Sequence, residues 1–188
     1  MNALIEKFPT VAEIGEIEYE LDTDFRTCLK IILAFEDTTL TNQEKIFIML
    51  ELLYKNNIPQ DINKAAELGV LFLNCGTEDK EETVQEKRVY SFEKDSQYIY
   101  TALNQTYGID LDSTDYMHWW KFCMMFRDLK EDCFFTKLID LRNRKNKGKL
   151  TKEEKEYCYK IKDIVDLPRM RTAEEIQAKN KFMELLGN

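Results

Sequence analysis

The sole histidine, His118, is the first residue to consider for metal binding or catalysis. With Asp115 it forms an Asp-x-x-His spacing, which on a helix would place two metal ligands on one face. Catalytic zinc usually needs three protein ligands and structural zinc four, and Cys123 lies five residues on from His118, off that face. A packed or hydrogen-bonded histidine is therefore favoured, and we expect no catalytic residue, no metal site and no cofactor.

Signatures of reactive or phosphate-binding sites are absent from the sequence. It contains neither a GxSxG nucleophile motif nor the glycine loops GxxxxGK[ST] and GxGxxG. Its 35 Asp and Glu residues are typical of solvated faces, and no pair stands out for acid–base catalysis. We expect a protein that is not an enzyme, with a small regulatory or enzymatic protein centred on His118 left open as an alternative.

The formal net charge of −8 bears on the partners of the chain. Binding to DNA or RNA depends on Lys and Arg that neutralise phosphates, so an acidic chain argues against nucleic acid and against anionic membrane and favours a basic partner. The one basic cluster runs from Arg142 to Lys149. We expect it to be a solvated loop after a helix, whose C-terminal end attracts cations.

Cysteine usage indicates a reducing compartment, and hydropathy gives no sign of a membrane span. The five cysteines are scattered without a CxxC pair, most on apolar helical faces: Cys28, Cys75, Cys123, Cys133 and Cys158. We therefore expect free, mostly buried thiols in a cytoplasmic protein. No apolar run suits a signal peptide or approaches the length of a membrane span.

Periodicity predicts one hairpin followed by helices. Residues 10–21 alternate between apolar and acidic on either side of Gly15, which favours a β-hairpin. From Asp22 onward the spacing becomes helical, with Asp22 or Thr23 as the expected cap. Gly76 is expected at the C′ stop of a helix that begins near Asp61. Three capping boxes start at threonines, namely Thr41, Thr151 and Thr172.

The most apolar segment, Ser113 to Leu129, predicts a helix with two apolar stripes. Such a helix is buried among others or pairs with a partner. Adjacent positions point about 100° apart on a helix, so we expect Trp119 and Trp120 to divide between core and contact surface. The tentative partner-contact residues are Trp119, Trp120, Phe122 and Met125.

These elements predict a mainly α, bundle-like domain with a small N-terminal β-hairpin. We expect a single domain over residues 1–188. Its halves would be residues 1–76, with the hairpin and three helices, and residues 89–188, which are helical. The charged and nearly anchor-free residues 77–88 would form the connector between them.

The string from Tyr90 to Phe122 resembles a small bacteriophage family named after gene product fifteen, found in tailed phages and prophages of Gram-positive bacteria. Thr23 to Arg26 (TDFR), after a short hairpin, also fits the family. No motif can be carried over after Leu141. The matching strings are Ser91–Phe92, Asp95 with Tyr98–Ile99, Tyr107 to Leu111 (YGIDL) and His118 to Phe122 (HWWKF).

The resemblance implies a gene in the tail module, between the major tail protein and the tape measure protein. Tail-assembly chaperones occupy that place in long-tailed phages, where they coat the tape measure protein and help recruit tail-tube subunits. We therefore expect such a chaperone in the bacterial host cytoplasm, acting through helix-to-groove contacts, with self-association left open. A structural tail component retained in the virion is the alternative. The family has no catalytic residues to carry over.

Overall fold

The computed structural model describes residues 2–55, 57–77 and 87–168, and within them the chain forms two compact units. The first unit contains residues 2–77 together with Tyr116–Phe122, and the second contains residues 87–115 together with Cys123–Pro168. The described residues are mainly helical with a two-stranded antiparallel hairpin near the N-terminus, which confirms the predicted fold class.

The hairpin consists of β1 (Val11–Ile14) and β2 (Ile17–Glu20), inside the predicted range. Gly15 begins the turn with φ at 67°, a left-handed conformation that glycine adopts without steric cost. A hairpin this small needs support from other elements. Tyr19 provides a contact of this kind, because its ring meets that of Tyr54 edge-on at a centroid distance of 6.3 Å.

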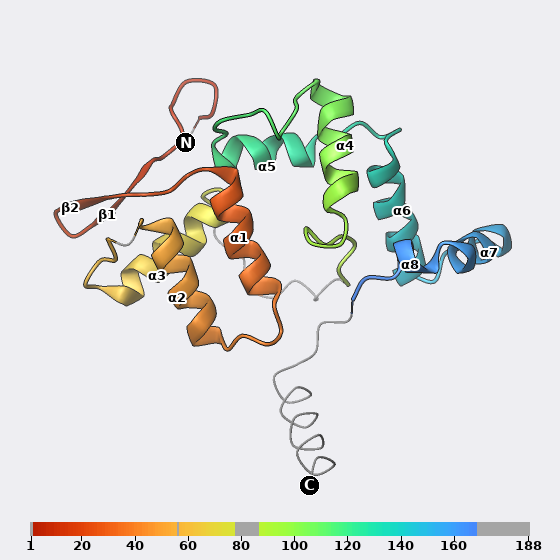
Figure 1. The fold of residues 1–188 in the computed structure, drawn as a ribbon, viewed down its shortest axis with the longest axis horizontal. Helices are drawn as coiled ribbons and strands as arrows, with labels where there is room; N and C mark the ends of the chain where they lie inside the picture. The colour runs from red at the N-terminus through yellow and green to blue at the C-terminus, as the bar shows by residue number, and fades with distance from the viewer. Residues whose placement is uncertain (1, 56, 78–86, 169–188) are drawn as a thin grey trace, which may run out of the picture. The chain divides into compact units, whose positions relative to one another are not determined.

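Three helices follow the hairpin in the first unit: α1 (Phe25–Glu36), α2 (Asn42–Leu53) and α3 (Ile62–Leu73) (Figure 1). The predicted capping box at Thr41 is present. The cap of α1 is Asp24, one or two residues later than predicted. Each helix starts after a residue whose side chain accepts a first-turn N–H, namely Asp24, Thr41 and Asp61.

The core of the first unit lies where α2 packs against α1 and α3. Gly69 of α3 permits the close approach of α2, because a Cβ there would lie 3.2 Å from the Met49 side chain. The Tyr54 hydroxyl donates to the Ala65 carbonyl over 2.9 Å, and burial raises the pKa of Tyr54 to about 12. Further buried side chains are Cys28, Ile31, Leu50, Leu53 and Phe72.

Helix α3 ends in a Schellman-type turn one residue earlier than predicted. The Gly76 N–H donates to the Leu71 carbonyl over 2.8 Å, and the Cys75 N–H donates to Phe72 over 3.0 Å. Cys75, with φ at 55°, therefore takes the C′ position expected for Gly76, which follows at φ 74°. Glycine is needed here for a second reason, because a Cβ on Gly76 would lie 3.1 Å from the Trp120 ring.

The second unit is built from α4 (Ser96–Tyr107), α6 (Phe134–Asn146), α7 (Lys152–Lys160) and α8 (Lys162–Val165). Gly108 ends α4 in a left-handed conformation, as predicted. The capping box at Thr151 also forms, and it starts α7. A small apolar core joins α6, α7 and α8, and Tyr98 of α4 packs against it: Leu138, Leu141, Cys158 and Val165.

The basic cluster corrects the expectation of a solvated loop. Residues Arg142 to Asn146 belong to α6, and the Arg142 side chain is buried. Arg144 pairs with Asp140 and with Glu154, while Lys145 pairs with Asp166. These cations therefore neutralise carboxylates of their own unit. Charge pattern alone could not indicate this, because two of the acids lie on other elements.

Helix α5 (Trp119–Arg127) is shorter than the predicted helix from Ser113 to Leu129. Local hydrogen bonds from side chains replace the first turns of the predicted helix. The Thr114 hydroxyl donates to the Asp110 carbonyl over 2.7 Å, and the Asp112 N–H donates to the Asp110 carboxylate over 3.1 Å. Side-chain bonds of this kind offer the backbone an alternative to the helix.

Some expectations fall outside the described residues. These are the third capping box at Thr172 and nearly all of the connector at residues 77–88. Within the part that is described, no helix has both the length and the apolar character needed to cross a bilayer.

Candidate functional site

The four predicted partner-contact residues are all buried within the chain. Relative exposures are 3% for Trp119, 6% for Trp120, 1% for Phe122 and 9% for Met125. Phe122 stacks between Phe25, at a centroid distance of 5.1 Å, and Trp119, at 5.6 Å. These side chains therefore serve the cores, and contact with a partner stays a prediction for them.

Both tryptophans hold the same end of α3. The indole N–H of Trp119 donates to the Leu73 carbonyl over 2.9 Å, and that of Trp120 donates to the Phe72 carbonyl over 2.8 Å. The last carbonyls of a helix lack a full set of intrahelical partners, and the Phe72 carbonyl, which also accepts the Cys75 N–H, has a second lone pair for the indole. Long indole side chains reach them from adjacent positions, which is why one neighbouring element receives both residues.

The segment before α5 pairs with the start of α1. Asp24 and His118 form an isolated antiparallel bridge, in which the Phe25 N–H donates to Met117 over 2.9 Å and the Trp119 N–H donates to Thr23 over 2.7 Å. The Asp24 carboxylate caps α1 and also accepts the Met117 N–H over 3.2 Å. One side chain thus joins two segments that lie 93 positions apart.

His118 joins the start of α5 to the segment at Pro9 through two hydrogen bonds, and we call this pair of contacts the latch. Its Nδ1 accepts the Trp120 N–H over 3.1 Å, which is the position of an N-cap side chain for α5. Its Nε2 lies 3.0 Å from the Pro9 carbonyl, so the tautomer protonated at Nε2 satisfies both contacts. Burial lowers the pKa of His118, although the bond to Pro9 opposes that shift. The neutral ring is therefore the form that fits.

The Asp115–His118 spacing does not lie on a helix, because both residues precede α5, and Asp115 is exposed. Among the described residues, no group of three or more His, Cys, Asp or Glu side chains is placed to hold a metal ion. The five cysteines all lie in that part and form no disulfide. Burial, followed by the charges of Asp22 and Asp24, raises the pKa of Cys28, which keeps the thiol protonated and unreactive.

An open pocket of about 450 Å³ lies beside β1 in the first unit, and we call it the β1 pocket. Its volume falls in the range of roughly 300–1,000 Å³ found for ligand pockets. Glu13 is the one charged residue of the lining. Most of the remaining wall is apolar and includes Val11, Leu21, Leu68, Leu71, Phe72 and Trp120.

The β1 pocket connects to the latch through two of its walls. Pro9, whose carbonyl contacts His118, lines the pocket, and so does Trp120, whose N–H is bonded to His118. The His118 ring also lies 5.0 Å from the Phe8 ring, between centroids. Of the four predicted contact residues, Trp120 alone is part of the lining. Its 6% exposure is therefore compatible with a contact inside the pocket.

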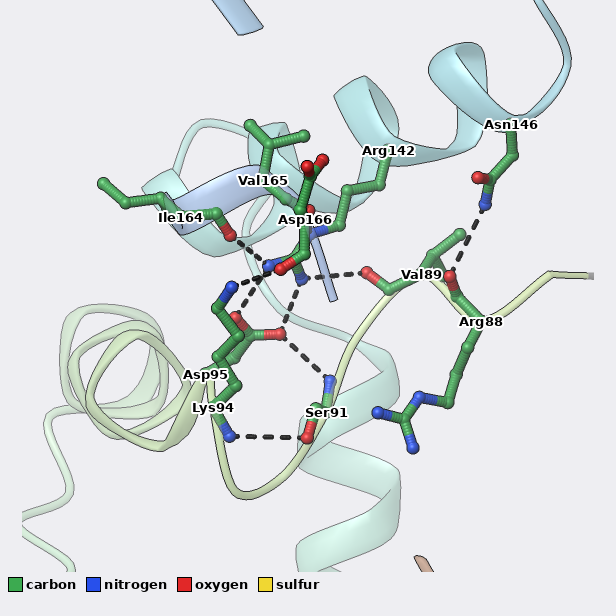
Figure 2. Close-up of polar contacts among 10 residues, drawn as sticks. All are labelled: Arg88, Val89, Ser91, Lys94, Asp95, Arg142, Asn146, Ile164, Val165 and Asp166. Carbon is green, nitrogen blue, oxygen red and sulfur yellow. Dashed lines mark hydrogen bonds and ion pairs between the residues drawn. The ribbon is translucent and has the colours of Figure 1, made fainter. Parts of the chain in front are cut away.

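A buried ion pair between Asp95 and Arg142 forms the polar centre of the second unit (Figure 2). The two side chains are 0% and 3% exposed. Arg142 Nη1 donates to Asp95 Oδ2 over 2.6 Å and Nη2 donates to Oδ1 over 2.9 Å. The Ser91 N–H donates to the same carboxylate over 3.0 Å. This geometry is bidentate, the strongest form of such a pair.

The other donors of Arg142 reach backbone carbonyls. Nε donates to Val165 over 2.8 Å, Nη1 to Val89 over 3.1 Å and Nη2 to Ile164 over 2.6 Å. All five N–H groups of the guanidinium are therefore used. The pair joins the start of α4, the middle of α6 and the end of α8, as Figure 2 shows. Sequence reasoning missed it, and its members lie 47 positions apart.

The model of the family described as bacteriophage Gp15 protein matches residues 4–167 of the chain. The chain belongs to this family. No curated protein and no solved structure matches the chain. The match confirms the resemblance that the sequence predicts, and it identifies a phage-related protein.

The sequence strings that resemble the Gp15 family contribute to two polar clusters, the Asp24–His118 pairing and the network around Arg142. The TDFR segment, through Asp24, pairs with His118 of HWWKF in the first unit. In the second unit Ser91 and Asp95 both belong to the Arg142 network. Structural roles therefore account for these polar residues: each caps, bridges or neutralises a group of the fold.

Proposed function

We propose that this Gp15 family member is a tail-assembly chaperone that acts on the tape measure protein in the host cytoplasm. The observation that carries the proposal is the β1 pocket, an open and largely apolar concavity with a single charged residue in its lining. Apolar recesses of this kind suit the anchor side chains of a partner helix. The tail role itself comes from the resemblance to the family.

A role in binding, without catalysis, is also part of the proposal. The two ring nitrogens of His118 already have backbone partners, and every donor of Arg142 is occupied. A general base or an anion site would need such groups free to face a ligand. These buried polar residues therefore support the fold and leave recognition to the pocket and its surroundings.

The proposal is tested by co-expression with the tape measure protein of the same phage genome, with and without the tail-tube subunit. We expect an affinity-tagged chain to co-purify with the tape measure protein and to raise its soluble yield. The control is the same co-expression with an unrelated acidic helical protein. Absence of co-purification, together with an unchanged soluble yield, would contradict the proposal.

The same material separates the chaperone from a structural tail component. Mass spectrometry of purified mature particles should detect the tail-tube subunit and no copies of this chain. Stoichiometric recovery of the chain from particles would favour the structural alternative, in which the protein remains in the virion.

A further inference from the structure

We propose that the β1 pocket binds a partner segment that presents a large apolar side chain next to a lysine or arginine. The inference deepens the proposed function and rests on it only for the identity of the partner, because a helical client would supply the segment. The pocket lies wholly within the first unit, so no relation between the units is involved.

The pocket walls indicate the apolar half of the segment. Leu68 and Leu71 of α3 are half-buried, and both line the pocket. Val11 of β1 is 40% exposed and completes the same wall. Exposed apolar surface around a concavity is a feature of interaction sites. A leucine, methionine or phenylalanine entering here would cover these three side chains together.

The hairpin indicates the basic half of the segment. Glu13, in the pocket wall, lies directly opposite Glu18 in the β-sheet register. Side chains opposed in this way have Cβ atoms about 4.5–5.5 Å apart, and like charges there are destabilising. Glu16 adds a third carboxylate at the turn. The hairpin therefore places like negative charges opposite one another, an arrangement that destabilises a β-sheet.

Within the described residues, this charge is left unneutralised. Among the described residues, Glu20 of the hairpin pairs with Lys55, whereas Glu13, Glu16 and Glu18 have no ion-pair partner. A cation from another molecule would remove the repulsion between Glu13 and Glu18, and it would do so at the edge of an apolar recess. A net charge of −8 also favours the approach of a basic segment.

The test uses two synthetic helical peptides that differ only in charge. Both carry apolar anchors at positions i, i+4 and i+7, flanked by lysines in one peptide and by glutamates in the other. Binding is followed by calorimetry and by tryptophan fluorescence, since Trp120 lines the pocket. We expect the lysine peptide to bind the full-length protein, more weakly at high salt, and the glutamate peptide not to bind.

Protein variants locate the site. Glu13→Gln and Glu18→Gln should each lower the affinity for the lysine peptide by about two- to fivefold, the usual contribution of one exposed charge pair. Glu51→Gln removes an exposed carboxylate of α2 outside the pocket lining and is the matched control. Leu71→Gln should abolish binding, and circular dichroism checks its fold. The glutamate variants test the proposal even if Leu71→Gln fails to fold.

The possible outcomes distinguish failure of this inference from failure of the proposed function. Equal binding of the two peptides, or equal effects of Glu13→Gln and Glu51→Gln, would remove the role of charge. Self-association that is abolished by Glu13→Gln would make a second copy the occupant. If Glu13→Gln and Leu71→Gln leave co-purification of the tape measure protein unchanged, the β1 pocket is not the binding site, although the proposed function stands. Peptide binding without any co-purification would refute the function and leave the pocket intact.

Discussion

The two units of this protein satisfy their buried polar groups by different means. In the first unit, neutral side chains bond to backbone: His118 to Pro9 and Trp120, and the two indoles to the end of α3. In the second unit, a bidentate ion pair between Asp95 and Arg142 collects five donors and several carbonyls. The first arrangement borders an open pocket, whereas the second is enclosed among three helices.

The difference shows how each unit should respond to perturbation. Removing one member of a buried ion pair leaves a charge without compensation, which is far more costly than losing a neutral hydrogen bond. The neutral His118 contacts have a smaller energy at stake, and burial lowers the pKa of the ring, so the neutral form is lost only as pH falls. We therefore expect substitutions in the polar centre of the second unit to cause a large loss of stability. Substitutions around His118 in the first unit should cause a smaller loss.

The largest effect is expected for Arg142→Met, which leaves the Asp95 carboxylate buried without a partner. The second unit should lose about 3–5 kcal/mol of its free energy of unfolding. Urea denaturation followed by far-UV circular dichroism measures the loss. Arg144→Met is the matched control, because that arginine lies on the same helix but pairs at an exposed position, and little change is expected. Similar losses in the two variants would break the comparison.

An intermediate effect is expected at two glycines, one in each unit. Gly76 and Gly108 both have positive φ, at 74° and 66°, so alanine at either position should cost about 1–2 kcal/mol in backbone strain. A Cβ at Gly76 would also lie 3.1 Å from the Trp120 ring, whereas one at Gly108 meets nothing within 4 Å. Gly76→Ala should therefore be the more destabilising variant, and tryptophan fluorescence should change in that variant alone.

The smallest effect is a pH dependence of the first unit. Burial lowers the pKa of His118 in the folded protein, so the unfolded chain binds this proton more readily. Stability from the neutral latch should be complete above the ordinary histidine pKa of about 6.5 and should decline as pH falls below it. Unfolding by urea between pH 7.5 and 5.5, monitored by tryptophan fluorescence, measures the decline.

His118→Asn provides the control for that experiment. Asparagine is a good N-cap residue and does not titrate, so it can keep the bond to the Trp120 N–H while removing the proton equilibrium. The variant should be nearly insensitive to pH over the same range. An equal decline in the variant and the wild type would assign the pH dependence to other groups.

Local signals in the sequence predicted much of the fold correctly. The capping boxes at Thr41 and Thr151 form as expected, and Gly15 and Gly108 take the left-handed positions of a turn and a helix stop. Each of these depends on hydrogen bonds between residues at most four positions apart. The predicted helix from Ser113 failed because bonds around Asp110, and pairing of Met117 to Trp119 with the start of α1, replaced its first turns.

The sequence by itself determined the hairpin, the capped starts of α2, α3 and α7 and the acidic balance, because these follow from short-range spacing and composition. Its resemblance to a phage family was also readable without a structure. Only the tertiary structure decided which polar residues meet. Asp95 could have been a solvated helix cap and Arg142 a surface cation, yet their elements cross so that each removes the charge of the other. The chain path likewise brings Glu13, Leu68 and Trp120 around one pocket. Such meetings depend on long-range packing, which no local spacing encodes.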